Sequence, residues 1–209
     1  MSGPAPGEPS DAALLRRHAD GETDAFGLLF KRHKDRLWAV ALRITCDPDD
    51  AADALQEAMI SAFRRASDFR AEAAVTTWLH RIVVNASLDL LRRRSVRSVG
   101  WSGDPDDLPI PERQGVDSAA RTDSRLDVDA AMRTLAPPQR AALVLVDMLG
   151  YSVADASVIL GVSEGTVKSR CARGRTKLLP HLSHLRSNYP GRGNQAVADD
   201  VPSEQGGGV

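Results

Sequence analysis

The sequence contains few aromatic side chains, which make up 4% of its 209 residues. A hydrophobic core with so few rings must be filled mainly by Leu, Val, Ile and Ala. Glycine is also rare within the segments whose apolar residues recur at regular spacing. This combination favours short packed helices over sheets, so we predict an all-α protein.

Cysteine is nearly absent: Cys46 and Cys171 lie far apart, and neither belongs to a CxxC pair. We therefore expect two small, mostly buried thiols in a reducing compartment, with no disulfide framework and no metal or other cofactor. A redox role for either thiol is the less favoured alternative, because no neighbouring residue marks an activated thiolate.

Targeting and membrane-spanning signals are missing as well. Residues 1–9 contain no basic start followed by an apolar stretch, which a signal peptide requires. No apolar run approaches the roughly 20 residues of a transmembrane helix. These absences predict a cytoplasmic protein.

The formal net charge of −1 argues at first against a nucleic-acid partner, but the charges are unevenly distributed. Residues 101–129 contain eight acidic and three basic side chains, whereas residues 130–186 contain eight basic and three acidic ones. A basic segment that follows an acidic one is suited to contacts with phosphate.

The N-terminal half shows the apolar spacing of helices. Asp47 followed by Pro48 predicts a helix start, because Asp caps helices and Pro fits their first turn. A further helix is expected from Thr76 or Thr77 to Arg94. Residues 11–94 are therefore predicted to form one helical bundle, after a disordered segment 1–10. The spacing of three and four that defines the first helix is carried by Phe26, Leu29, Phe30, His33, Leu37, Val40, Ala41 and Ile44.

This pattern stops at residue 95. Three prolines and many acids predict a flexible, solvated linker over residues 95–124. Apolar periodicity returns near Leu126 and predicts a second helical domain over residues 125–186. The Gly- and Asp-rich tail, residues 187–209, is expected to be disordered.

The second domain contains the spacing of a helix-turn-helix: a helix over 153–160, Gly161 at the turn, and a helix over 164–179. Ser152 with Asp155 resembles a capping box, and Gly161 can adopt the positive φ of a sharp turn. We expect the first turns of the last helix to read bases and its later basic residues to hold phosphates. The predicted DNA-binding residues are Glu164, Thr166, Lys168, Ser169, Arg170, Arg173, Arg175 and Lys177.

Four segments together resemble the signatures of bacterial ECF sigma factors of the sigma-70 family. They are residues 47–57 (DPDDAADALQE), 77–94 (from TWLHRIVVN to DLLRRR), 135–140 (LAPPQR) and 165–170 (GTVKSR). Residues 78–85 and 146–148 are most similar to the sigma M group of actinobacteria. The resemblance covers about residues 11–94 and 125–182.

The resemblance implies two small domains, a sigma-2 helical bundle and a sigma-4 helix-turn-helix. Such a protein binds core RNA polymerase at its clamp coiled coil and flap, recognises the −10 and −35 elements of promoter DNA, and helps to open the DNA. It also implies an inhibitory anti-sigma factor, which in this family is often membrane-anchored. The basic helix over 164–179 is then expected to read the −35 element.

The resemblance also assigns roles in the first domain. The residues implied in −10 recognition are Asp68, Phe69, Arg70, Arg81, Asn85, Arg92, Arg93 and Arg94. Those implied in polymerase binding are Asp50, Asp53, Gln56 and Glu57, which helical steps of three and four bring to one polar face. For Trp78 a core position is favoured over a stacking platform. Three linker acids, Asp104, Asp106 and Asp107, are expected to imitate phosphate in the polymerase cleft.

Two other classes of function remain as alternatives. A stand-alone helix-turn-helix regulator would bind a palindrome as a dimer without polymerase. An enzyme is disfavoured, because the five histidines form no set with a nucleophile, and Cys171 with His181 and His184 lacks zinc spacing.

Overall fold

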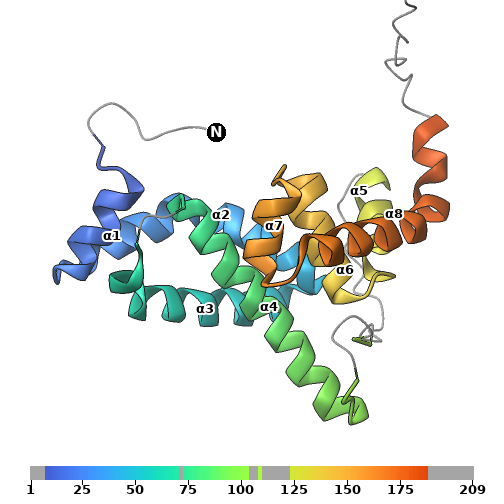
Figure 1. Ribbon diagram of the computed structural model, residues 1–209, viewed down its shortest axis with the longest axis horizontal. Helices are drawn as coiled ribbons and strands as arrows, with labels where there is room; N and C mark the ends of the chain where they lie inside the picture. The colour runs from blue at the N-terminus through green and yellow to red at the C-terminus, as the bar shows by residue number, and fades with distance from the viewer. Residues whose placement is uncertain (1–7, 71–72, 104–107, 110–122, 188–209) are drawn as a thin grey trace, which may run out of the picture.

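The computed structural model describes residues 8–70, 73–103, 108–109 and 123–187, and these residues form helices and no strand (Figure 1). The all-α prediction is confirmed. The helices are α1 (Asp11–Ala19), α2 (Thr23–Thr45), α3 (Pro48–Arg64), α4 (Val75–Val99), α5 (Asp123–Arg133), α6 (Pro137–Leu143), α7 (Val153–Leu160) and α8 (Glu164–Ser187). A 3₁₀ turn, Ala66–Asp68, follows α3, and a π-helical turn, Val144–Met148, follows α6.

Helices α1–α4 form an N-terminal bundle in which α2, α3 and α4 pack on one another and α1 packs on α2. Cys46 ends α2 in the left-handed conformation, with φ 57°. The Asp47 carboxylate then accepts a hydrogen bond from the Asp50 backbone N–H at 2.9 Å, with Pro48 in the first turn of α3. The helix start predicted at Asp47 is therefore observed. The core of this bundle is aliphatic, with Leu, Ala, Val and Ile fully buried.

The structure differs from the predicted boundaries at both ends of the bundle. Helix α4 continues five residues past Arg94. The first of these residues, Ser95, is 6% exposed, so this turn of the helix is still packed although the apolar spacing in the sequence has ended. Glu8 pairs with Arg32, and Ser10 caps α1, so residues 8–10 are ordered by polar contacts that apolar spacing does not reveal. The rest of the predicted disordered ends, residues 1–7 and 188–209, lies outside the described residues.

Part of the predicted solvated linker is also held against the protein. Leu108 is 4% exposed and belongs to the core, and Trp101 packs against that core. Composition marks the segment as polar on average, but two apolar residues are enough to anchor it. Asp104, Asp106 and Asp107 lie outside the described residues.

Helices α5–α8 form a C-terminal unit in which α5, α6 and α7 all pack against α8. Gly161 turns the chain between α7 and α8 with φ +66°. Gly174 lets α8 approach α6 closely, since a Cβ at this position would lie 2.7 Å from Leu143 Cδ1. Helix α8 runs to Ser187, eight residues beyond the predicted end at 179, and includes Pro180.

The two halves pack on each other, with α7 against α4 and α6 against α2. His80 Nδ1 lies 2.7 Å from the Tyr151 hydroxyl. The guanidinium of Arg140 is 1% exposed and donates to the Ile44 carbonyl at 2.6 Å and to the Leu135 carbonyl at 2.8 Å. The sequence predicted two linked domains but not this docking.

Candidate nucleic-acid and polymerase-binding surfaces

The helix-turn-helix is built by side-chain caps at the start of both helices. The Asp155 N–H donates to Ser152 Oγ at 3.0 Å, and Ser152 Oγ lies 2.7 Å from the Asp155 carboxylate. In the usual capping box a Glu carboxylate accepts from the backbone N–H of the cap residue. Asp155 is one methylene shorter, and its carboxylate accepts from the Ser152 hydroxyl instead. The Thr166 N–H donates to Ser163 Oγ at 3.1 Å. Val167 is fully buried and fixes α8 against the unit.

Helix α8 divides its predicted DNA-binding residues between two faces. The exposed face comprises Glu164, Lys168, Ser169, Arg173, Arg175 and Lys177, with Thr166 partly exposed. Arg170 lies on the inner face and is 7% exposed. This burial does not expose Arg170 for base contacts in the isolated chain, and its predicted role in DNA binding stays a prediction. It follows Val167 by three positions and precedes Gly174 by four, and this spacing could have placed it inside.

Arg175 also differs from the prediction. It donates to both carboxylate oxygens of Asp147, at 3.0 and 2.6 Å, and this carboxylate raises the pKa of Arg175. The pair joins α8 to the π-helical turn. A guanidinium used in this way is less available to phosphate than an exposed side chain with a looser contact. Lys168 is such a side chain, with its Nζ 3.8 Å from the Glu164 carboxylate.

Helix α4 likewise separates its predicted −10 residues. Arg81, Asn85 and Arg92 are exposed and recur at steps of four and seven, so they lie along one stripe of the helix. Arg93 points instead to α3, where it donates to the Glu57 carboxylate at 2.5 Å. Arg94 forms an ion pair with Asp50. The three consecutive arginines therefore serve two different surfaces, which their clustering did not predict.

The loop before α4 holds the other three predicted −10 residues. Asp68 and Arg70 are exposed, and Phe69 is partly buried. The ring of Phe69 meets Trp78 edge to face, with centroids 5.6 Å apart. Trp78 is itself partly buried against the core, which agrees with the favoured packing role. Residues 71–72 of this loop lie outside the described residues.

The predicted polymerase-binding face on α3 contains three of its four residues. Asp53, Gln56 and Glu57 are exposed at steps of three and four. Asp50 is 5% exposed, because it sits in the first turn against Arg94. Asp50 therefore belongs to the link between α3 and α4 rather than to the outer face.

Two models of known protein families match this chain, one in each half. Residues 29–97 match the family model "Sigma-70 region 2", and residues 125–178 match "Sigma-70, region 4". The ECF RNA polymerase sigma factor SigM of Mycobacterium tuberculosis is 47% identical over 180 residues, which cover 86% of this chain and 88% of that protein.

This chain belongs to the sigma-70 family, among its ECF sigma factors. Solved structures agree. A structure of CnrH in complex with the cytosolic domain of CnrY has a TM-score of 0.58 and 26% identity, and covers 83% of this chain and 97% of that one. The sigma factor RpoE of Bartonella quintana, in complex with the anti-sigma factor NepR, has a TM-score of 0.57 and 25% identity, and covers 76% and 96%.

Membership settles the class of function. An ECF sigma factor binds core RNA polymerase and directs promoter-specific initiation, and it is not an enzyme. The stand-alone regulator is thereby set aside, because the chain contains the polymerase-binding region as well as the helix-turn-helix. The resemblance to the sigma M group is supported by the identity to SigM.

The remaining chemistry of this sigma factor is sparse in the part of the chain that the structure describes. No group of three or more His, Cys, Asp or Glu side chains is placed to hold a metal ion there. Burial raises the pKa of the Cys46 and Cys171 thiols, so neither is an activated thiolate. Within the same residues, no helix has the length and apolarity to cross a membrane.

Proposed function

We propose that this sigma factor divides promoter recognition and polymerase binding among three exposed helix faces. The −35 face is Lys168, Ser169, Arg173 and Lys177 on α8. The −10 stripe is Arg81, Asn85 and Arg92 on α4, together with the loop Asp68–Arg70. The clamp face is Asp53, Gln56 and Glu57 on α3. The observation that carries this proposal is the split of Arg92, Arg93 and Arg94, which separates the −10 stripe from the contacts between α3 and α4.

The −35 face has the chemistry of major-groove recognition. Its N-terminal turns present Lys168 and Ser169 to solvent, and a helix that enters the groove by this end brings such residues to base edges. Arg173 and Lys177, one and two turns later, are placed to hold phosphates. Arg170 is expected to act from within the fold by positioning α8.

The −10 stripe has the chemistry of strand capture. Its two arginines and one amide extend over 11 residues of α4, which is about 16 Å of helix or roughly five base steps. This length is close to that of a −10 element. Cationic and amide groups in such a row follow a sugar-phosphate backbone without requiring a paired strand.

The clamp face is acidic and therefore suited to a basic partner helix on core polymerase. Arg93 holds Glu57 from the side of α4, whereas the side chain of Asp53 is exposed. Because Glu57 is already paired, Asp53 and Gln56 are expected to supply most of the contact with polymerase.

We also propose an anti-sigma factor as a regulatory partner, held at a membrane, and a cytoplasmic location for this chain. The support is that CnrH and RpoE, which resemble it, were solved with CnrY and NepR bound. In one of these the bound partner is the cytosolic domain of CnrY. Core polymerase and promoter DNA, which this chain binds, are cytoplasmic in bacteria.

The experiment that tests the three faces is footprinting of holoenzyme on one cognate promoter. The double variant Lys168→Ala with Arg173→Ala should lose protection of the −35 element and keep the affinity for core polymerase. Asp53→Arg should lower the affinity for core polymerase and leave the footprint of saturated holoenzyme unchanged. Arg16→Ala, which removes an exposed charge from α1, is the matched control. A −35 variant that loses core affinity instead would contradict the division.

A further inference from the structure

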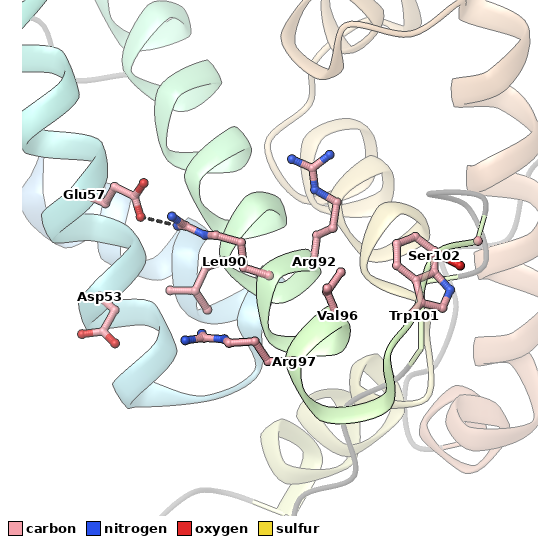
Figure 2. A pocket seen from close by; sticks show the side chains of 10 residues that line it. Asp53, Glu57, Leu90, Arg92, Val96, Arg97, Trp101 and Ser102 are labelled. Atoms are coloured by element: carbon pink, nitrogen blue, oxygen red, sulfur yellow. Dashed lines mark hydrogen bonds and ion pairs between the residues drawn. The ribbon is translucent and has the colours of Figure 1, made fainter.

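A groove of about 780 Å³ follows the C-terminal half of α4, and the part of it that lies beyond Arg92 is not used by the functions above (Figure 2). Its walls are α3, α4 and the segment 101–103, which directly follows the helix. The residues that line it combine three arginines, apolar groups and one tryptophan. Figure 2 shows Asp53 and Glu57 on the α3 side, whereas Arg92, Val96 and Trp101 lie on the other side of α4.

The side of the groove that carries Trp101 is cationic and apolar. It presents Arg92, Val96 and Trp101, followed by Ser102 and Gly103. The two carboxylates of the groove, Asp53 and Glu57, are on α3. The Trp101 side therefore suits a ligand that has both an anionic group and a flat apolar surface.

Trp101 is held in place while one part of it stays accessible. A Cβ at Gly103 would lie 3.0 Å from Trp101 Nε1, so the glycine backbone packs directly against the indole. The indole is partly buried on the core, and Val96 beside it is 49% exposed. A large ring fixed by the fold loses little conformational entropy when a second ring stacks on it.

The guanidinium of Arg92 can exchange its ion pair with Asp89 for a contact with a phosphate. Its ion pair with Asp89, at 3.0 Å, joins two side chains that are both more than half exposed. Such a pair contributes little to stability, so a phosphate can replace the carboxylate at small cost. Arg92 is also the last residue of the −10 stripe, and the groove continues that stripe past its end.

We propose that this groove binds one nucleotide of the opened promoter, with its base stacked on Trp101 and its phosphate held by Arg92. The proposal rests on the −10 role proposed for α4. It adds to that role a stacking residue beyond the end of the helix, outside every segment that carries the family signatures. A base on an aromatic side chain is recognised by its π-face and not by its sequence.

Open-complex lifetime on a pre-melted promoter tests this, with holoenzyme made from core polymerase and the full chain. Trp101→Leu should shorten the lifetime about tenfold or more. Trp101→Phe should keep most of it, because a phenyl ring still stacks. Arg16→Ala, which removes an exposed charge from α1 outside the groove, should leave the lifetime unchanged. The affinity for core polymerase should be the same for all four proteins.

Abasic sites placed singly across the melted region identify the partner base. At one position the abasic template should shorten the wild-type lifetime and have no further effect on Trp101→Leu. An equal lifetime for Trp101→Leu and wild type overturns the proposal. A loss of core affinity in Trp101→Leu and Trp101→Phe also overturns it, and makes the groove a polymerase contact. Failure of the wild-type holoenzyme to initiate would instead contradict the proposed function of the whole chain.

Discussion

At the scale of single residues, the arginine run at the end of α4 illustrates how neighbours in sequence acquire different tasks. Arg92 faces solvent beside Asp89, whereas Arg94 reaches the buried carboxylate of Asp50. Removal of one partner from a buried charge leaves the other charge poorly compensated, which costs more than the loss of an exposed pair.

We therefore predict that substitutions at Arg94 and Arg92 affect different properties, stability and promoter opening respectively. Arg94→Gln should lower the free energy of unfolding by about 1–2 kcal/mol, since Asp50 loses an ion-pair partner. Arg92→Gln should change it by less than about 0.5 kcal/mol and should weaken promoter opening. Urea unfolding and open-complex formation measure the two effects. Equal stability of the two variants would contradict the separation of the arginines.

His80 provides a residue-scale prediction of pH dependence. Burial, then the positive charges of Arg36 and His33, lower its pKa from 6.5 to about 4. The unfolded chain therefore binds a proton that the folded chain does not bind between these values. Stability from this group is fully present above pH 6.5 and is lost as the pH falls towards 4, on the order of 1 kcal/mol per pH unit.

Urea unfolding of wild type and His80→Gln between pH 4.5 and 7.5 measures this contribution. The wild type should lose more stability than the variant on acidification. The other four histidines are common to both proteins and cancel in the comparison. Parallel pH profiles for the two proteins would exclude a neutral, buried His80.

At the scale of helices, the sequence predicted starts better than ends. Asp47 and Ser152 were recognised because capping is local chemistry, carried by a side chain and a backbone N–H three residues apart. The ends of α4 and α8 were placed too early, because both helices continue through polar residues after the apolar spacing fades. The −35 helix was predicted, but the inward orientation of Arg170 depends on packing against the rest of the C-terminal unit.

Two glycines of α8 allow a matched test of how that helix is seated. Gly174→Ala places a Cβ 2.7 Å from the Cδ1 of buried Leu143, so it should cost about 1–3 kcal/mol and weaken −35 binding. Gly165→Ala meets nothing closer than Ser163 Oγ at 3.7 Å. It should be neutral or stabilise the helix by about 0.5–1 kcal/mol. Thermal unfolding of the two variants compares them, and a Gly174→Ala protein as stable as wild type would contradict the close approach of α6 and α8.

At the scale of the molecule, the two halves are docked through contacts that local sequence patterns cannot reveal. His80 and Tyr151 are 71 residues apart, and Arg140 reaches Ile44 across 96. Among the residues that the structure describes, two buried polar atoms at this interface, His80 Nε2 and Arg140 Nε, have no hydrogen-bond partner. Such an interface is less well satisfied than a permanent core, which favours reversible docking.

We expect this docking to open on a promoter. The centres of −35 and −10 elements are about 25 base pairs apart, or about 85 Å of B-DNA. A compact body of about 150 residues is only about 40 Å across. By chain length alone, residues 104–122 can reach about 60 Å, which is enough to separate the two halves while Trp101 and Gly103 stay in place.

We predict that the distance between the halves increases when promoter-bound holoenzyme forms. Dyes on cysteines introduced at the exposed positions Asp20 and Leu179 should show less energy transfer in the promoter-bound complex than in the isolated chain. Tyr151→Phe, which removes the hydroxyl beside His80, should lower the transfer of the isolated chain. Unchanged transfer on assembly would show that the halves do not separate.

Run-off transcription with mapped starts tests the central claim most directly. Purified chain is added to core RNA polymerase with a pool of genomic promoters, and the same is done with the variant Lys168→Ala with Arg173→Ala. With the wild-type chain, the account predicts new starts that share one −10 and −35 pair. With the variant, it predicts the loss of the starts that depend on the −35 motif. A polymerase that stays silent with the wild-type chain, or a variant that loses all starts together with core binding, would contradict it.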